Sequence, residues 1–297
     1  MPGDVEFYLE EIRRAGSPVL ELGCGTGRLL ELIAREGFNV VGLDRAPSML
    51  KIARAEVALL PPDVSALIEI VDGDMRAIAL NRQFKLAIIP YRAFLHLLTV
   101  QDHRAALASI HEHLEDGGRL AFNIFDPDLE MIVERSSDIG DALTRLTEFE
   151  TPETGRKIVV WDGRLDDLES QIVTEYRIFE ELNPDGVVVK KTYTPLALRW
   201  VYRYEMEHLL ELCGFEVEAL YGNFMRGPYT PEAEQVWVAR KVGCIREISR
   251  FRKFRVPLGL NRLDRTLSRL YLGRLLSSLH TWSGGRVVSG MGFECVH

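Results

Sequence analysis

A short apolar segment that runs directly into three closely spaced glycines constrains this chain more than any other feature of its sequence. Residues 18–22 read Pro-Val-Leu-Glu-Leu, and Gly23, Gly25 and Gly27 follow. Glycine permits tight turns and lets the backbone approach a ligand, because it has no Cβ. The helix expected next, to about residue 36, presents free N–H groups and a positive dipole end. The segment therefore predicts a buried strand, a ligand-binding turn and a helix.

Strands and helices alternate through the first 125 residues. Besides the first strand, apolar runs predict strands at 39–44, 66–71, 84–90 and 119–125. Helices are expected at about 4–14, at 47–60, where Pro61 and Pro62 end the helix, and at 99–114, where Thr99 and Asp102 form a capping-box pattern. This alternation predicts a parallel sheet with helices on both faces.

The pattern changes after residue 126. Antiparallel strands are expected at 156–163, 170–180 and 187–194, with a hairpin turn at 183–186. A helix at about 204–213 and strands from 214 and at 235–239 then complete the core. The predicted fold class is α/β, with a Rossmann-like seven-stranded sheet, helices on both faces and an antiparallel β insertion after strand five. The predicted domains are a core at 1–126, a β-rich lid at 127–202, the end of the core at 203–240 and a basic C-terminal extension at 241–297.

The glycine spacing argues against a dinucleotide site. Such a site needs Gly-x-Gly-x-x-Gly, and Arg28 stands where its third glycine belongs. Glu21 would also lie near the pyrophosphate of a dinucleotide and repel it. The same carboxylate suits a ligand that carries a cationic amino group.

Residues 21–27 read Glu-Leu-Gly-Cys-Gly-Thr-Gly, which resembles motif I of the class I S-adenosylmethionine (SAM)-dependent methyltransferases. Later blocks follow in that family's order over about residues 5–240. The resemblance implies that SAM is the cofactor and that Glu21 meets its amino group. Asp44 would accept both ribose hydroxyls, Asp74 would contact the adenine amino group, and Met75 would pack on the ring. The predicted cofactor residues are Tyr8, Glu21, Gly23, Gly25, Thr26, Gly27, Asp44, Arg45, Met49, Asp74, Met75 and Pro90.

Several of these side chains have a second interpretation. Tyr8 resembles a tyrosine that closes over SAM in related small-molecule enzymes, and it is equally an ordinary surface or core aromatic. Met49 is either an adenine contact or a core residue. The predicted catalytic residues are Tyr91, Arg92 and His96, which follow the fourth strand, at the edge where open α/β sheets bind ligands. His96 is either a structural histidine or the candidate general base that lies nearest to this strand end in the sequence.

The insertion resembles the β lid of small-molecule methyltransferases such as glycine and amino-sugar N-methyltransferases. This correspondence concerns architecture, so it leaves the methyl acceptor unidentified. Four residues at its end either line the acceptor pocket or seat the lid on the core. They are Arg199, Trp200, Tyr202 and Tyr204.

A sulfonium methyl is already an activated electrophile, so the protein must mainly align it with the acceptor and exclude water. We therefore expect metal-independent, in-line transfer to a nitrogen or oxygen of a small molecule. The sequence predicts no metal site, and His103, His111 and His113 are expected to be surface histidines on a helix. Two alternatives stay open: a catalytically silent SAM-binding regulator, and an RNA methyltransferase that uses the basic tail.

Charge is distributed unevenly along the chain. Residues 240–297 carry 12 Lys and Arg against three Asp and Glu, whereas the net charge of the whole chain is −8. The acidic body makes nucleic acid an unlikely general partner. The tail is expected to form a helix that packs on the body or across a homodimer, or one that contacts anionic lipid or nucleic acid. No apolar run is long enough to span a membrane, and the scattered cysteines fit a cytoplasmic location.

Overall fold

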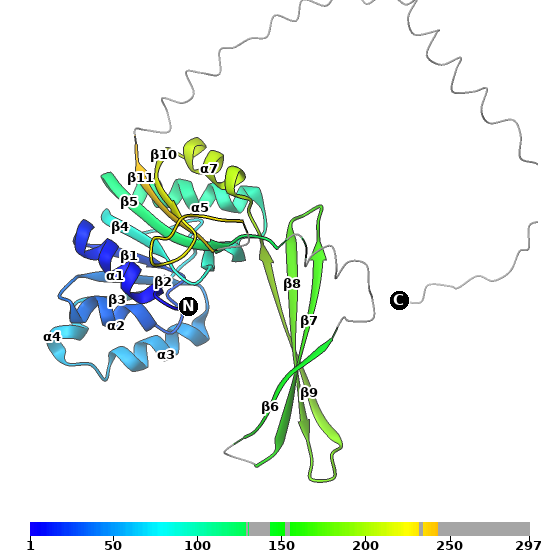
Figure 1. The fold of residues 1–297 in the computed structure, drawn as a ribbon. Coiled ribbons are helices and arrows are strands. Elements are labelled where there is room, and N and C mark those ends of the chain that lie inside the picture. Colours follow the sequence, from blue (N-terminus) through cyan, green and yellow to red (C-terminus); the bar gives the residue numbers. More distant parts are fainter. Residues whose placement is uncertain (129, 131–142, 152–154, 232–233, 243–297) are drawn as a thin grey trace, which may run out of the picture. The chain divides into compact units, whose positions relative to one another are not determined.

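The computed structural model describes residues 1–128, 130, 143–151, 155–231 and 234–242, in which the chain forms two sheets (Figure 1). The larger sheet has seven strands in the order β10-β11-β5-β4-β1-β2-β3. The smaller sheet has four strands in the order β6-β7-β8-β9. The predicted α/β fold with an antiparallel insertion is confirmed.

The strand order of the larger sheet places a ligand crevice. Its strands are β1 (Val19–Leu22), β2 (Val40–Asp44), β3 (Ile68–Asp72), β4 (Phe84–Ile89), β5 (Leu114–Phe125), β10 (Phe215–Tyr221) and β11 (Glu234–Lys241). The pairs among β1 to β5 are parallel, whereas β11 runs antiparallel to both β5 and β10. The chain adds β2 and β3 on one side of β1 and then returns to place β4 on the other side. Open sheets bind ligands at the carboxyl ends of strands where the order reverses, here between β1 and β4.

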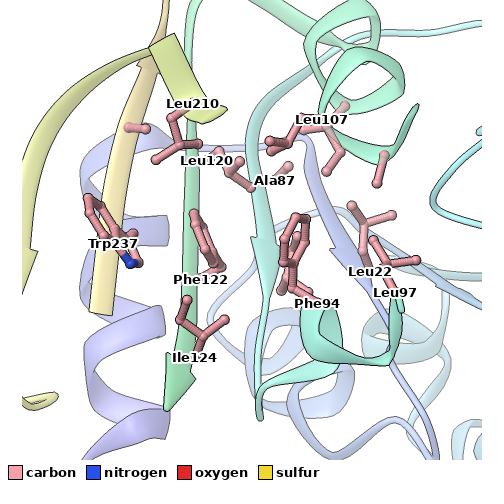
Figure 2. Packing of buried hydrophobic residues seen from close by; sticks show 14 of the residues in the cluster. Leu22, Ala87, Phe94, Leu97, Leu107, Leu120, Phe122, Ile124, Leu210 and Trp237 are labelled. Carbon is pink, nitrogen blue, oxygen red and sulfur yellow. The ribbon is translucent and has the colours of Figure 1, made fainter. Parts of the chain in front are cut away.

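Helices cover both faces of this sheet and bury two apolar clusters. They are α1 (Asp4–Ala15), α2 (Arg28–Arg35), α3 (Pro47–Val57), α4 (Pro62–Ser65), η1 (Ala93–His96), α5 (Val100–His113) and α7 (Arg203–Leu212). One cluster packs Phe94, Phe122 and Trp237 together (Figure 2). The other contains Phe7 of α1 and Ala121. Phe122 and its neighbour Ala121 enter different clusters because successive strand residues point to opposite faces.

The predicted turns and caps are mostly where expected. The Thr99 hydroxyl accepts a hydrogen bond from the Asp102 N–H at 3.0 Å, which confirms the N-terminal cap of α5. Several boundaries differ from the prediction: α3 ends at Val57 instead of residue 60, and β7 and β9 extend to Asp167 and Arg199. Strand β5 begins at Leu114 instead of residue 119, because a register shift against β4 absorbs the Gly117–Gly118 step. Pro62 begins the short helix α4, a position where the missing N–H of proline costs nothing.

The smaller sheet has one strand more than the sequence predicted. It consists of β6 (Thr144–Glu150), β7 (Lys157–Asp167), β8 (Ile172–Leu182) and β9 (Val188–Arg199). The hairpin turn at 183–186 is present, with the Gly186 N–H donating to the Asn183 carbonyl at 2.9 Å. Every residue of β6 is exposed, and its sequence Thr-Arg-Leu-Thr-Glu-Phe-Glu does not alternate apolar with polar residues, so it carries no strand pattern.

The insertion is joined to the core by buried residues at its ends. Val173 and Leu198 belong to the same apolar cluster as Phe94. The buried Arg199 guanidinium donates to Gln171 at 3.0 Å and to Glu205 at 3.2 Å. Trp200 is fully buried, whereas Tyr202 and Tyr204 are exposed. Arg199 and Trp200 therefore seat the insertion on the core.

Two further predictions concern the C-terminal extension and membrane-spanning segments. The basic extension predicted at 241–297 lies outside the described residues, apart from Lys241 and Val242. Within the described ranges, no helix combines the length and the apolar character needed to cross a membrane.

Candidate functional site

A cavity of about 380 Å³ opens at the carboxyl ends of the central strands, where the strand order predicts a ligand crevice. Its volume lies within the range of small-molecule sites. It is lined by Gly23, Gly25, Leu43, Asp44, Arg45, Ala46, Met49, Gly73, Asp74, Met75, Pro90, Tyr91, Ala93, His96 and Leu97. Ten of these were predicted site residues, contributed by segments that are far apart in the chain.

The glycine turn between β1 and α2 forms one wall. Gly23 has φ 71° and Gly25 has φ 57°, in the left-handed region that favours glycine. A Cβ on Gly23 would lie 2.7 Å from the Cβ of Ala93, so no larger residue fits there without movement. A Cβ on Gly25 would meet no atom within 4 Å, because this residue borders open space. The turn thus brings bare backbone to the cavity.

Glu21, near the end of β1, has a buried polar atom without a partner. The side chain is almost completely buried, and its Oε2 atom has no hydrogen-bond partner among the described residues. Burial raises the pKa of Glu21 to about 8, although the nearby Arg28 opposes this shift. A buried carboxylate needs a cationic partner to remain ionised. An ammonium group placed next to Glu21 would meet this need.

Asp44, at the end of β2, is fixed by the backbone around it. Its Oδ2 accepts from the Gly25 N–H and its Oδ1 from the Ala46 N–H, each at 2.8 Å. A carboxylate oxygen has a second lone pair, and Asp44 lines the cavity. Its remaining acceptor capacity suits a pair of hydroxyl donors.

Asp74 and Met75 follow β3 and line the same cavity, together with Met49 of α3. Of the two interpretations of Met49, the structure favours the cavity contact, since the side chain is exposed and not part of the core. The Arg76 guanidinium is the main cause of a lowered pKa of Asp74, so this carboxylate is ionised at neutral pH. An ionised carboxylate is an acceptor only, which suits an amino donor on a ligand.

The turn after β4 forms the opposite wall. Tyr91 and Arg92 have φ 55° and 63°, so two consecutive non-glycine residues adopt the left-handed conformation. Such strain is concentrated at functional sites. The turn places the exposed Tyr91 at the mouth of the cavity. The centroid of its ring lies 6.0 Å from Cζ of Arg28.

His96, in η1, also faces this cavity. The residue keeps an exposed edge, yet partial desolvation of the ring, followed by the positive charge of Arg45, lowers the pKa of His96. The imidazole is therefore neutral at pH 7 and able to accept a proton.

Five predicted residues lie outside the cavity lining: Tyr8, Glu21, Thr26, Gly27 and Arg92. Tyr8 is fully buried beside Phe7 and donates its hydroxyl to Asn123 at 2.8 Å, which corresponds to the core interpretation. The Arg92 guanidinium forms an ion pair with Glu234 at 2.7 Å. Arg92 is thus held at the edge of the sheet instead of pointing freely into the cavity.

Some residues of this region were not predicted. Leu43, Ala46, Ala93 and Leu97 line the cavity as neighbours of predicted residues, and their types carry no chemical signal. Glu234 accepts from Arg92 and from Asn123, which links strands β5 and β11 to the turn after β4. Only the antiparallel pairing of β11 with β5 brings Glu234 to this edge, from more than 100 residues away.

The prediction of surface histidines on α5 was wrong for two of the three. His103 is fully buried, stacks on Phe94 at 4.7 Å between ring centroids and contacts the Leu97 carbonyl at 2.8 Å. Burial lowers the pKa of His103 to about 4. His111 is also buried. This face of α5 lies against the sheet, so both rings are structural.

Comparison with known proteins agrees with this geometry. Residues 19–118, which include the glycine turn and all three strand-end carboxylates, match the family model described as a methyltransferase domain. This chain carries a methyltransferase domain. The resemblance seen in the sequence is thereby confirmed.

Two curated relatives are methyltransferases by name. A dTDP-3-amino-3,4,6-trideoxy-α-D-glucopyranose N,N-dimethyltransferase of Streptomyces venezuelae is 35% identical over 102 residues, 34% of this chain and 40% of that enzyme. A cypemycin N-terminal methyltransferase of a Streptomyces species is 26% identical over 224 residues, 75% of this chain and 82% of that enzyme. The chain spans less than half the length of the first two curated relatives, 40% and 47%.

Solved structures match over most of the chain. The CcbJ methyltransferase from Streptomyces caelestis has a TM-score of 0.65 at 22% identity, over 82% of this chain and 97% of that one. CalS10, a SAM-bound amino pentose methyltransferase from Micromonospora echinaspora, has a TM-score of 0.59 at 24% identity, over 82% and 92% of the two chains. A share of 82% of the chain extends well beyond residues 19–118, so the likeness of fold is not confined to that segment.

Proposed function

We propose that this protein transfers a methyl group from SAM to a nitrogen atom of a small-molecule acceptor. The observation that carries the proposal is the buried, unpaired Glu21 carboxylate at the end of β1, with Asp44 and Asp74 at the next two strand ends. Two similar proteins have names that point the same way: a dTDP-amino-sugar N,N-dimethyltransferase and an amino pentose methyltransferase.

Each strand end would hold a different part of the cofactor. Glu21 would pair with the ammonium group, Asp44 would accept the ribose hydroxyls, and Asp74 would accept from the adenine amino group. The glycine turn would lie against the middle of the molecule, where a Cβ on Gly23 would clash with Ala93. SAM supplies a sulfonium methyl that reacts by in-line displacement.

The protein's own chemistry then concerns the acceptor. An amine attacks only in its neutral form, so its proton must leave before transfer. We place His96 in this role, since its neutral ring lines the cavity. Tyr91, at the mouth, would orient the acceptor and exclude water. Correct alignment accounts for much of the rate, because it replaces a bimolecular encounter.

Removing the two acceptor-side groups is expected to slow turnover without loss of cofactor. We expect His96→Asn to lower kcat by about 100-fold or more, the range of a lost proton transfer. We expect Tyr91→Phe to lower kcat by about 10-fold, the effect of one lost hydrogen bond. The dissociation constant of SAM should change by less than about threefold, because the three carboxylates remain. The control is His208→Asn, an exposed histidine on α7. Full turnover by both variants would reject this assignment.

Cofactor binding is expected to release about one proton at pH 7. The pKa of Glu21 is about 8 in the ligand-free protein, so the carboxyl group is mostly protonated there. An ammonium partner favours the ionised form and lowers that pKa. Affinity for SAM should therefore rise as the pH increases towards 8, by up to about tenfold per pH unit. Calorimetry in buffers with different ionisation enthalpies counts the protons, and a count near zero would contradict the role of Glu21.

A turnover assay with an acceptor panel tests the function itself. The panel contains amino sugars, peptides with a free amino terminus, phenols and RNA, and S-adenosylhomocysteine is measured as the product. We expect product with an amine. SAM binding without turnover on any acceptor would favour the regulator, and methylated RNA would favour the RNA enzyme. Failure to bind SAM would reject the proposal.

We also propose domain boundaries, an oligomeric state and a location for the protein. We retain the division into a core at 1–126, a lid at 127–202, the end of the core at 203–240 and a basic extension at 241–297. We also retain the homodimer and the cytoplasmic location, for which the free, buried thiols of Cys24 and Cys213 give limited support. Truncation after residue 242, with activity and oligomeric state measured, tests the role of the extension.

A further inference from the structure

Arg76 follows the proposed adenine contacts and holds Asp74 through three donors. Its backbone N–H donates to Asp74 Oδ1 at 2.9 Å, and its Nε to the same oxygen at 3.0 Å. Its Nη2 donates to Asp74 Oδ2 at 2.6 Å. A planar guanidinium that grips a carboxylate in this forked way fixes both its position and its orientation.

The other arm of Arg76 is anchored in a different element. Its Nη1 donates to Asp102 Oδ1 at 2.7 Å, in the first turn of α5. The second oxygen of Asp102 accepts from the Thr99 hydroxyl at 2.8 Å, and Thr99 caps the same helix. Arg76 therefore connects the segment after β3 to a capped helix end, which gives Asp74 a rigid support.

This arrangement limits what Asp74 can still accept. A carboxylate offers about four acceptor positions in all. The three donors of Arg76 make four contacts with Asp74, because Nε is shared between Oδ1 at 3.0 Å and Oδ2 at 3.1 Å. At most about one acceptor position therefore remains on this residue, which lines the cavity. A single remaining acceptor matches one N–H of an amino group, and it repels a carbonyl oxygen at the same place.

We propose that Arg76 is a positioning residue that makes the base pocket selective for a 6-amino purine, by leaving Asp74 one acceptor site in a fixed orientation. The inference rests on the proposed function, because it concerns the cofactor of that reaction. Without the guanidinium, the Asp74 side chain can rotate and become solvated. The pocket then loses discrimination between an amino and an oxo group at position 6 of the purine.

The test compares two ligands that differ at that position, S-adenosylhomocysteine and S-inosylhomocysteine, by calorimetry. A hydrogen bond to a charged group is worth about 1.5–3 kcal/mol, so the native protein is expected to prefer the adenine ligand by about 10- to 100-fold. In Arg76→Gln, this ratio is expected to fall to within about threefold. Arg76→Lys should give an intermediate ratio, because an ammonium lacks the fork.

Two further variants separate positioning from a general loss of structure. Asp102→Asn weakens the outer arm and keeps the Asp74–Arg76 pair, so it should lower the ratio less than Arg76→Gln. Arg82→Gln removes an exposed arginine that pairs with Glu69 of β3 and should leave the ratio unchanged. If Arg76→Gln does not fold, Arg76→Lys and Asp102→Asn decide the question.

The outcomes distinguish this inference from the proposed function. A native protein that binds neither ligand rejects the proposed function and this inference with it. A native protein that binds both ligands equally, or an Arg76→Gln variant that keeps the native ratio, overturns only the role of Arg76. A ratio that falls while the S-inosylhomocysteine dissociation constant stays within about threefold supports it, because a damaged pocket would weaken both ligands.

Discussion

Glu21→Gln is expected to weaken SAM binding by about 100- to 1,000-fold. Removing one partner of a buried ion pair costs about 3–5 kcal/mol, because the remaining charge stays desolvated and unpaired. In this variant that remaining charge is the ammonium group of the ligand. Calorimetry measures the dissociation constants of both proteins at about pH 8, where the native carboxyl group is partly ionised even before the ligand binds.

The same substitution is expected to stabilise the ligand-free protein at alkaline pH. The pKa of Glu21 is about 8 in the folded protein, whereas a solvated glutamate has a pKa of about 4.5. A carboxyl whose pKa is raised by folding costs no stability below about pH 4.5, and its cost grows up to about pH 8. The unfolding midpoint of Glu21→Gln should therefore exceed that of the native protein near pH 8, and the difference should vanish towards pH 4.5.

Glu11→Gln is the matched control for both measurements. Glu11 is another buried glutamate, but Arg226 pairs with it at 2.6 Å, and it lies on α1 outside the cavity lining. We expect unchanged SAM affinity in this variant and lower stability instead of higher, because Arg226 loses the carboxylate charge of residue 11. Equal loss of affinity in both variants would contradict the proposed role of Glu21.

Asp44→Ala is expected to reduce SAM affinity by about 100-fold or more and to destabilise the ligand-free protein. The loss of affinity follows from two ribose hydrogen bonds to a charged group, at about 1.5–3 kcal/mol each. The loss of stability, about 1–3 kcal/mol, follows because the N–H groups of Gly25 and Ala46 lose their acceptor. Calorimetry and denaturant unfolding measure the two effects separately.

Asp72→Ala is the control for Asp44. Asp72 ends β3 and is the register partner of Asp44, yet its side chain is exposed and outside the cavity lining. We expect SAM affinity within about twofold of the native value and little change in stability, as is usual for exposed sites. If Asp44→Ala instead bound SAM as tightly as this control, the ribose contact would have to be abandoned.

The residues that we propose to hold the cofactor could be predicted because they lie in short segments of the sequence. Glu21, Gly23 and Gly25 lie within five residues, and a strand that turns directly into a helix has few alternatives. Asp44 was found in the same way, as the carboxylate that ends the second apolar strand, whereas Asp74 was assigned because residues 73–76 resemble a block of the methyltransferase family. In a parallel sheet these ends meet at one edge, so their proximity follows from the fold class alone.

Features that depend on long-range packing escaped prediction. His103 reads as polar, but α5 turns it onto Phe94, where a single hydrogen bond offsets the cost of burial. Tyr8 carries the residue type of a cofactor contact, and the aromatic cluster with Phe7 withdraws it from the cavity lining. Burial decides the role of such amphipathic side chains, and burial depends on neighbours that are distant in the chain.

The sequence by itself determined the order of strands and helices, the glycine turn and the three strand-end carboxylates, because each depends on residues within a few positions of one another. Only the tertiary structure decided that Arg92 pairs with Glu234 and that Arg76 joins Asp74 to Asp102. An ion pair needs two charges within a few ångströms, and no local pattern specifies which of many charges will meet. The packing of α5 and β11 against the central strands makes that choice.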